Sequence, residues 1–300
     1  MIRYGESSWW DLLFTVMNPL PSLNQFRQTA IKRLTRADVD APRLTAEVVL
    51  AHALDLTRTQ LLAQPDGPLT PDQLTRAHGD LERLANGEPL AYVVGHREFY
   101  DIDLLTDRRA LIPRPETECL IEHALKLLAE HPAPLIVDVG TGCGAIAVTL
   151  AKHLRRARVI AVDLSPEAIE LARENARRIG VEARLEFRVG HLLAPVTETP
   201  HLLAANLPYI NDKDWPFLAR TIRGHEPRMA FIGGPDGLDL VRSLLHDAPR
   251  LMLPGSAILL EIGAYQGDDV SEIARQNFPQ ARIGIKPDYS GLDRLAIIEV

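Results

Sequence analysis

The fold is decided by residues 135–144, which read LIVDVGTGCG. The short apolar run over residues 135–139 predicts a buried strand, and the apolar pattern of residues 145–154 predicts a helix after it. Glycines at 140, 142 and 144 let the connecting backbone turn sharply and approach a ligand closely. In such sheets ligands bind at the carboxyl ends of the strands. We therefore predict a ligand-binding turn at the end of the first strand of an α/β domain.

The spacing of these glycines, G-x-G-x-G, narrows the class of ligand. It differs from the G-x-G-x-x-G of dinucleotide-binding folds, and no Lys-Ser or Lys-Thr pair follows it as in a phosphate-binding loop. Asp163 ends the next apolar run, where a carboxylate can accept both ribose hydroxyls of a nucleoside. Asp163 can also be read as only a favourable charge near a helix N-terminus, beside Ser165. Together, the turn and the acidic residue favour a nucleoside-type cofactor held without a phosphate clamp.

The remaining pattern from about residue 117 alternates strands with helices. Such alternation predicts a mostly parallel sheet that is covered by helices on both faces, an α/β fold. The last two strands have no helix between them and should pair antiparallel. The predicted strands are 135–139, 159–162, 185–189, 202–205, 258–262, 281–285 and 295–300.

The N-terminal third carries a helical pattern instead. Ser22 with Gln25 and Thr70 with Gln73 predict capping boxes at helix starts, and Pro42 opens another helix. We predict an extension over residues 1–22, a helical domain over 23–90, a β-hairpin linker over 91–112 and an α/β domain over 113–300. Within the linker, we place the hairpin turn at residues 106–108.

Composition excludes several protein classes. The chain has 300 residues, 46 % hydrophobic and 24 % charged, as an ordinary globular protein does. A net charge of −7 argues against a protein that grips long nucleic acid. Cys119 and Cys143 make no disulfide framework, and the histidines lack metal-ligand spacing. The apolar stretch over residues 9–20 is interrupted and too short for a membrane span, so we expect a cytoplasmic protein with no membrane or metal partner.

A second motif, Asn206-Leu207-Pro208-Tyr209, follows the fourth strand and should lie at the same sheet edge as the glycine turn. The side-chain carbonyl of Asn206 and the backbone carbonyl of Leu207 are two acceptors that can hold both hydrogens of an NH2 group. The ring of Tyr209 can pack on a planar amide or base. In isolation the motif could equally be a turn with a buried tyrosine.

Together, these motifs resemble S-adenosylmethionine-dependent methyltransferases that act on planar NH2 groups. The closer resemblance is to the peptide chain release factor N5-glutamine methyltransferases (the PrmC/HemK family), over roughly residues 25–300. LIPRPETE combined with the glycine turn is specific to that family, whereas the turn alone indicates only the superfamily. Further matching segments are GEPLAY (87–92), GHREFY (95–100), LIPRPETE (111–118), EPR (226–228), GGPDGL (233–238), EIG (261–263) and GLDR (291–294).

The resemblance implies a Rossmann-like class I methyltransferase sheet with an antiparallel final strand, plus a small N-terminal helical bundle that docks the substrate. It implies S-adenosylmethionine as cofactor and transfer of its methyl group to N5 of the glutamine in the Gly-Gly-Gln motif of release factors. For the cofactor, it implies that Gly140, Thr141, Gly142, Cys143 and Gly144 surround the methionine part and that Asp163 holds the ribose. At the substrate amide it implies Asn206, Leu207, Pro208 and Tyr209, with Asn206 also beside the cofactor. Phe99 and Arg114 would help to close the pocket.

Two departures from the family pattern keep alternatives open. Leu207 stands where the family usually has proline, and the form found here is also typical of ribosomal RNA adenine dimethyltransferases. His191 stands where an aspartate commonly faces the adenine of the cofactor; it can still offer a hydrogen bond, or it is an exposed turn residue.

Two other functions therefore remain as alternatives. One is an adenine-N6 methyltransferase on RNA or DNA. Residues 24–90 argue against a basic arm for nucleic acid, because they carry 8 Lys or Arg and 9 Asp or Glu, a net of −1; we expect no stable nucleic-acid binding. The other is a non-catalytic cofactor-binding protein, against which the intact Asn206, Pro208 and Tyr209 argue.

Overall fold

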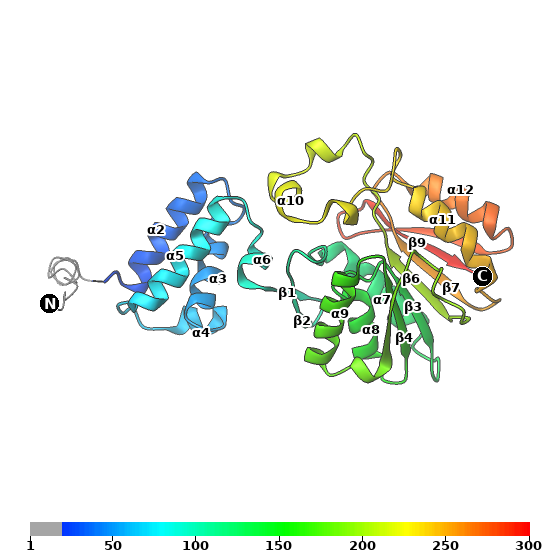
Figure 1. Ribbon diagram of the computed structural model, residues 1–300, viewed down its shortest axis with the longest axis horizontal. Helices are drawn as coiled ribbons and strands as arrows, with labels where there is room; N and C mark the ends of the chain where they lie inside the picture. Colours follow the sequence, from blue (N-terminus) through cyan, green and yellow to red (C-terminus); the bar gives the residue numbers. More distant parts are fainter. Residues whose placement is uncertain (1–19) are drawn as a thin grey trace, which may run out of the picture. The chain divides into compact units, whose positions relative to one another are not determined.

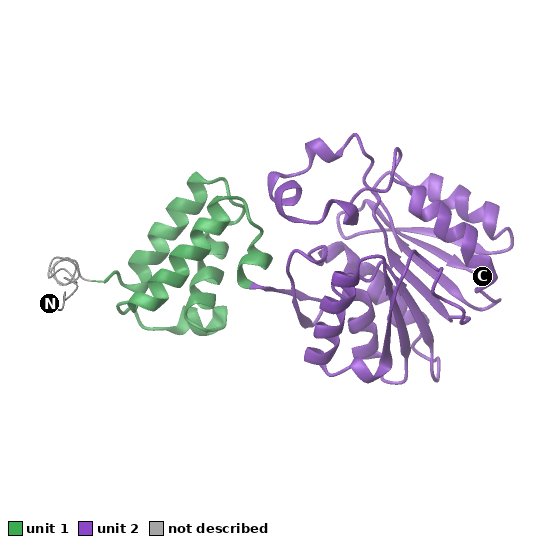
Figure 2. Cartoon of the chain, in the orientation of Figure 1, with its two compact units in different colours: residues 1–94 green, residues 95–300 purple. Residues whose placement is uncertain are grey.

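The computed structural model describes residues 20–300, and the chain forms two compact units that meet in sequence between Val94 and Gly95 (Figure 2). Most of the predicted extension over residues 1–22 lies outside the described residues. Within residues 20–300, no helix is both long and apolar enough to cross a membrane.

The first unit consists of helices packed around one apolar core that includes Leu34, Leu50 and Leu81. Capping boxes begin two of the helices at Ser22 and Thr70, as the sequence predicts. A third box, at Thr57, begins a short helix that the sequence analysis missed. The helices are α2 (Leu23–Arg36), α3 (Pro42–Ala53), α4 (Arg58–Ala63), α5 (Pro71–Ala85) and α6 (Leu90–Val94).

The segment that follows differs in two ways from the expected hairpin over residues 91–112. Residues 90–94 are helical, because Pro89 can begin a helix and Gly95, at φ +79°, ends it. The hairpin itself pairs β1 (His96–Phe99) with β2 (Ile102–Leu105). Its turn lies at Tyr100 and Asp101, so our placement at residues 106–108 was wrong. The cross-strand pair Phe99 and Ile102 closes the two-residue turn, and both side chains are buried.

The second unit contains a seven-stranded sheet in the order β5-β4-β3-β6-β7-β9-β8 (Figure 1). Within this sheet, strands β3 to β7 are parallel, and β9 pairs antiparallel with both β7 and β8. This arrangement confirms the predicted fold class. The strands are β3 (Leu135–Val139), β4 (Arg158–Asp163), β5 (Leu185–Val189), β6 (Leu202–Asn206), β7 (Ala257–Glu261), β8 (Arg282–Pro287) and β9 (Asp293–Glu299).

Helices cover both faces of this sheet, because consecutive side chains of the central strands point to opposite faces and most of them are apolar and buried. Ile136 and Val159 pack with residues of α7, α8 and α9, whereas Val137 and Ile160 pack with residues of α11 and α12. The helices of this unit are α7 (Glu118–Leu127), α8 (Ala145–His153), α9 (Pro166–Ile179), α10 (Arg220–His225), α11 (Asp239–Asp247) and α12 (Gly267–Asn277), with short 3-10 turns η1 (Pro115–Thr117), η2 (Glu182–Arg184), η3 (Trp215–Phe217), η4 (Arg228–Ala230) and η5 (Ala248–Arg250).

The strand register brings the predicted motifs to one edge of the sheet. Val139 at the end of β3 pairs with Val162 on β4 and with Ala205 on β6. Asn206 in turn pairs with Glu261 at the end of β7. The glycine turn, Asp163 and the Asn206 motif therefore share the carboxyl edge, where α/β sheets bind their ligands.

Candidate active site

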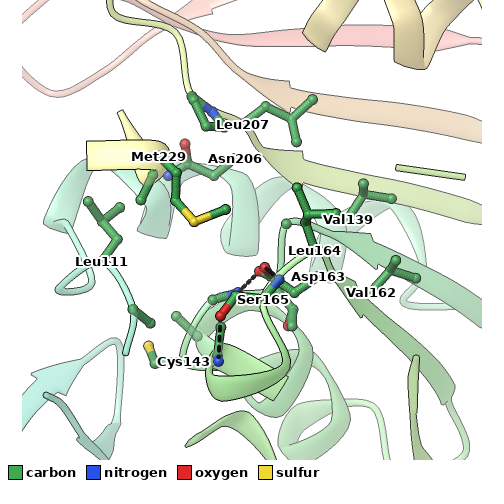
Figure 3. Close-up of a pocket in the computed structure, with 18 of the residues that line it drawn as sticks. Leu111, Val139, Cys143, Val162, Asp163, Leu164, Ser165, Asn206, Leu207 and Met229 are labelled. Atoms are coloured by element: carbon green, nitrogen blue, oxygen red, sulfur yellow. Dashed lines mark hydrogen bonds between the residues drawn. The ribbon is translucent and has the colours of Figure 1, made fainter. Parts of the chain in front are cut away.

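A pocket opens at the carboxyl edge of the sheet (Figure 3). About 1080 Å³ of space there is free of protein atoms, including a part that opens to solvent. Figure 3 shows Asn206 and Met229 across this space from Asp163 and Ser165. Of the residues predicted for the site, the pocket is lined by Arg114, Gly140, Thr141, Gly142, Cys143, Asp163, His191, Asn206, Leu207 and Pro208.

The turn after β3 requires its glycines. Gly140, Gly142 and Gly144 have φ values of +73°, +56° and +87°, which side-chain-bearing residues rarely adopt. A Cβ at Gly144 would lie 3.1 Å from Val148 and 3.2 Å from Ala172, and this closeness lets the turn pack on α8 and α9. Gly140 and Gly142 line the pocket, whereas Gly144, although predicted for the site, is not among its lining residues in the described chain and packs against α8 and α9 instead.

A buried carboxylate holds this turn from behind. Asp138 Oδ2 accepts hydrogen bonds from Thr141 Oγ1 at 2.6 Å and from the Ala147 N–H at 3.1 Å. Its other oxygen, Oδ1, is buried and has no hydrogen-bond partner within residues 20–300. Burial raises the pKa of Asp138 to about 7. Asp138 lies two residues before the glycine turn, and the structure shows that it supports the turn.

Asp163 at the end of β4 links the two neighbouring turns. Its Oδ2 accepts from the Gly142 N–H at 2.8 Å and its Oδ1 accepts from the Ser165 N–H at 2.9 Å. Burial raises the pKa of this carboxyl group. Since each carboxylate oxygen has two lone pairs, both oxygens can accept one more hydrogen bond from a ligand in the pocket.

Apolar side chains that the sequence analysis missed form other walls of the pocket. Leu164 is 53 % exposed although it is large and hydrophobic, and it lines the pocket beside Asp163. Leu192 and Met229 line it as well. A flat aromatic group such as a nucleobase could pack against such a wall. In the sequence, Leu164 could have been predicted as a pocket residue because it directly follows Asp163 at the end of a strand.

The Asn206 motif leads from β6 to the pocket. Asn206, Leu207 and Pro208 line it, but Tyr209 is not among its lining residues in the described part of the chain. The Tyr209 hydroxyl instead donates to Glu261 Oε1 at 3.3 Å, and burial raises the pKa of this phenol. The structure thus places Tyr209 behind the motif.

A further hydrogen-bonded group connects to this motif. Thr117, from η1, lines the pocket and donates through Oγ1 to Glu261 Oε2 at 2.5 Å. Asn206 Nδ2 donates to the same Thr117 oxygen at 3.1 Å. Burial raises the pKa of Glu261 to about 6. Both residues lie in segments that match the family, LIPRPETE and EIG, but the sequence pattern assigns neither to the site.

One more ion pair joins two segments that line the pocket. Arg114 Nη2 donates to Glu226 Oε1 at 2.5 Å, and the Ile112 N–H donates to Glu226 Oε2 at 3.0 Å. Pro227 and Met229, just beyond Glu226, are lining residues. Arg114 is therefore at the pocket, as the resemblance implies.

Phe99, the second residue expected to close the pocket, lies elsewhere. It is 2 % exposed and belongs to the apolar core with Ile102 and Leu104. It is not among the lining residues of the pocket in the described chain.

Comparisons with known proteins agree with this geometry. The family description "PrmC N-terminal domain" matches residues 25–95, and "Methyltransferase domain" matches residues 136–225. The release factor glutamine methyltransferase of Moorella thermoacetica is 43 % identical over 274 residues, which cover 91 % of this chain and 96 % of that protein. The protein of the same name from Koribacter versatilis is 39 % identical over 280 residues, covering 92 % and 98 %.

Among solved structures, the hMettl16 catalytic domain in complex with the MAT2A 3′UTR hairpin 6 has a TM-score of 0.52 to this chain. It is 15 % identical and covers 79 % of this chain and 85 % of that one. At this identity the likeness supports the fold alone.

Proposed function

The chain belongs to the release factor glutamine methyltransferase family, and we propose that it transfers a methyl group from S-adenosylmethionine to the side-chain amide nitrogen of a glutamine in peptide chain release factors. The observation that carries the proposal is the placement of two carbonyl acceptors, on Asn206 and Leu207, beside the pocket at the glycine turn. The target that we propose is the glutamine of the Gly-Gly-Gln motif, and the location is the cytoplasm.

The pocket fits S-adenosylmethionine in three respects. Gly140 and Gly142 line the pocket at φ values that favour glycine, so the cofactor meets backbone and no side chain at these two positions. Asp163 has lone pairs free for ribose hydroxyls beside its two backbone hydrogen bonds. Leu164 and Leu192 offer apolar surface for the adenine, with His191 at the same wall. When bound, this cofactor supplies an activated methyl group on its sulfonium sulfur.

The residues of the Asn206 motif would prepare the substrate nitrogen. An amide nitrogen is a weak nucleophile because its lone pair is delocalised into the carbonyl group. Acceptance of both N–H hydrogens, by Asn206 Oδ1 and the Leu207 carbonyl, would orient the nitrogen toward the methyl group. The two oxygens would also stabilise the positive charge that develops on nitrogen during transfer. The reaction needs no strong base beforehand, since the proton can leave the nitrogen after transfer.

The departure at Leu207 is compatible with this mechanism, because the acceptor is a backbone carbonyl that any side chain leaves in place. Pro208 holds the backbone of that carbonyl. Tyr209 would support the motif from behind through Glu261, rather than pack on the substrate amide.

We propose that the helical unit docks the release factor. A domain with "PrmC N-terminal domain" similarity over residues 25–95 supports this role, and its near-neutral charge favours a protein partner over a nucleic acid.

Adenine-N6 methylation of RNA or DNA is the second candidate function. Its chemistry would use the same two acceptors on an exocyclic NH2 group, and the form of the motif with Leu207 favours it. The net charge of −7 opposes it, because nucleic-acid binding draws on Lys and Arg neutralising phosphates.

The decisive experiment measures transfer of a labelled methyl group from S-adenosylmethionine to a purified release factor. Parallel reactions contain the same factor with its Gly-Gly-Gln glutamine changed to asparagine, and bulk ribosomal RNA. We expect label on the unchanged factor only. Label on RNA with none on protein would overturn the proposal and favour the second function.

A matched variant identifies the catalytic motif in the same assay. Asn206→Ala should abolish transfer while the Kd for S-adenosylmethionine stays within severalfold, because the pocket walls around the glycine turn remain. Equal transfer by this variant and the parent would remove Asn206 from the mechanism.

A further inference from the structure

A chain of three hydrogen bonds runs behind the proposed substrate site. Asn206 Nδ2 donates to Thr117 Oγ1, Thr117 Oγ1 donates to Glu261 Oε2, and the Tyr209 hydroxyl donates to Glu261 Oε1. The chain joins residues from η1, the end of β6 and the end of β7. Thr117 is 4 % and Glu261 3 % exposed, so water does not replace these contacts readily.

The donors and acceptors available in these three hydrogen bonds allow only one direction of donation. An ionised Glu261 has acceptors only, so both hydroxyls must donate to it. The Thr117 hydroxyl has a single proton, which it donates in the hydrogen bond to Glu261. Its oxygen can therefore only accept a hydrogen bond from Asn206. Asn206 must therefore turn Nδ2 toward Thr117. Its carbonyl oxygen, Oδ1, is left for the pocket, which Asn206 lines.

The polarity of this one amide matters because its two ends are similar in shape and opposite in hydrogen bonding. A flipped Asn206 would present N–H donors to the N–H donors of a substrate amide. The substrate hydrogens would then meet like charge in a site with low dielectric, where such an unpaired donor is costly.

We propose that Thr117 and Glu261 are positioning residues that lock the side-chain amide of Asn206 with Oδ1 toward the substrate NH2 group. The inference rests on the proposed function, because it assigns Asn206 Oδ1 to the substrate amide. Neither residue touches the reacting atoms in this assignment, and both act through Asn206. The pKa of Glu261, which burial raises to about 6, leaves the carboxylate mainly ionised at neutral and higher pH.

The test compares Thr117→Val, which keeps the shape but lacks the hydroxyl, with Thr117→Ser, which keeps the hydroxyl. Thr149→Val is the matched control, because Thr149 is also buried and its hydroxyl donates to a backbone carbonyl, that of Ala145, without lining the pocket. For each variant, kcat on a release factor, the Kd for S-adenosylmethionine and the Tm are measured. Glu261→Gln tests the other end of the chain, since its amide can donate to Thr117 and reverse the polarity.

We expect Thr117→Val to lower kcat by ~10- to 100-fold, less than the ~10²- to 10³-fold lost with a preorganised donor that touches the reacting group, because Thr117 acts through Asn206. The Kd for S-adenosylmethionine should change by less than about threefold. Thr117→Ser should recover most of the lost kcat, Glu261→Gln should resemble Thr117→Val, and Thr149→Val should keep the parental kcat.

Three results would overturn the inference. One is Thr117→Val with parental kcat, another is Thr117→Ser as impaired as Thr117→Val, and the third is loss of cofactor binding and Tm in parallel with kcat, as a merely structural role predicts. The parent protein distinguishes this failure from failure of the proposed function: if the parent transfers no methyl group to glutamine, the function itself is wrong, whatever the variants do.

Discussion

The Arg114 guanidinium and the Glu226 carboxylate lie 2.5 Å apart, and the carboxylate also receives the Ile112 N–H. One side chain thus fastens the segment before η4 to the segment before η1, and both segments line the pocket. The Glu226 side chain is 1 % exposed, whereas that of Arg114 is 30 % exposed. The pair should therefore hold one wall of the cofactor pocket in place.

Removal of the Glu226 carboxylate should loosen that wall. Glu226→Ala leaves the Ile112 N–H and the Arg114 guanidinium without their acceptor, so we expect the free energy of unfolding to fall by about 1–3 kcal/mol. The Kd for S-adenosylmethionine should rise as well. Glu226→Gln keeps one acceptor oxygen and should lose less. Urea unfolding and calorimetric titration check both effects, and equal losses for the two variants would contradict the role of the acceptor oxygens.

Asp163 should determine cofactor affinity. Asp163→Ala removes the acceptor proposed for the ribose and also frees the Gly142 and Ser165 N–H groups. We expect the Kd for S-adenosylmethionine to rise by ~10- to 100-fold, as for loss of hydrogen bonds to a charged group. The nearby exposed residue Glu167 gives a control, since Glu167→Gln should alter the Kd by less than about twofold. A similar change in both variants would point to a general charge effect.

Asp138 should make folding stability depend on pH. Its pKa is about 7 in the folded protein and near 3.9 when unfolded, so the native state holds the proton more tightly. The stability that this proton contributes is present below about pH 4 and is lost as the pH rises through 7, by at most about 4 kcal/mol.

The substitution Asp138→Asn isolates this effect, because an amide does not ionise. Relative to the parent, the variant should be more stable at pH 8 than at pH 5, as measured by urea unfolding at both values. A difference between the two proteins that does not vary with pH would show that Asp138 ionises normally.

Glu261 should produce the acid limb of the activity profile. As the pH falls through about 6, Glu261 gains a proton that it can donate to Thr117 or Tyr209, and the fixed polarity is lost. Arg294 on β9 favours the ionised form, and Glu116 on η1 opposes it. We expect kcat to decline below about pH 6 in the parent.

Measurement of kcat against pH for the parent and for Glu261→Gln checks this assignment. The variant should be slow throughout and lack that limb. An unchanged acid limb in the variant would assign it to another group.

Leu207 should serve the fold with its side chain and the reaction with its backbone. The side chain is 4 % exposed and packs in the core, near the turn at Gly140. Leu207→Ala should lower the free energy of unfolding by about 2–5 kcal/mol. Its kcat, measured well below the Tm, should stay within severalfold of the parent, in contrast to Asn206→Ala. A loss as severe as that of Asn206→Ala would show that the side chain matters to the chemistry.

Local patterns predicted most of the fold. The apolar runs, the capping residues and the glycine turn identified the strands and most of the helices, because periodicity and turn chemistry act within a few residues. The hairpin turn was misplaced because the linker contains two polar stretches that could form it. The turn that forms needs a positive φ at Tyr100, a conformation that a tyrosine rarely adopts and that the sequence therefore does not predict. The position of β9 between β7 and β8 depends on long-range packing, and the local sequence of neither neighbouring strand predicts it.

The site was predictable to the extent that it is local. The glycine turn, Asp163 and Asn206 were found because each follows directly from a strand end. Thr117 and Glu261 were missed, since they lie 144 positions apart and meet only through the sheet. Phe99 was expected at the pocket from resemblance, but the alternation of the hairpin turns it into the core.

Two parts of the site differ in the length of chain that must close to build them. The glycine turn and Asp163 lie within residues 138–165, two successive strand-to-helix turns, whereas the hydrogen bonds behind the substrate site join Thr117, Asn206 and Glu261 across most of the second unit. Closing long loops costs more entropy and is slower. A refolding molecule should therefore form the glycine turn and its link to Asp163 before the contact between Thr117 and Glu261, so that the fixed orientation of the Asn206 amide is among the last properties that folding delivers.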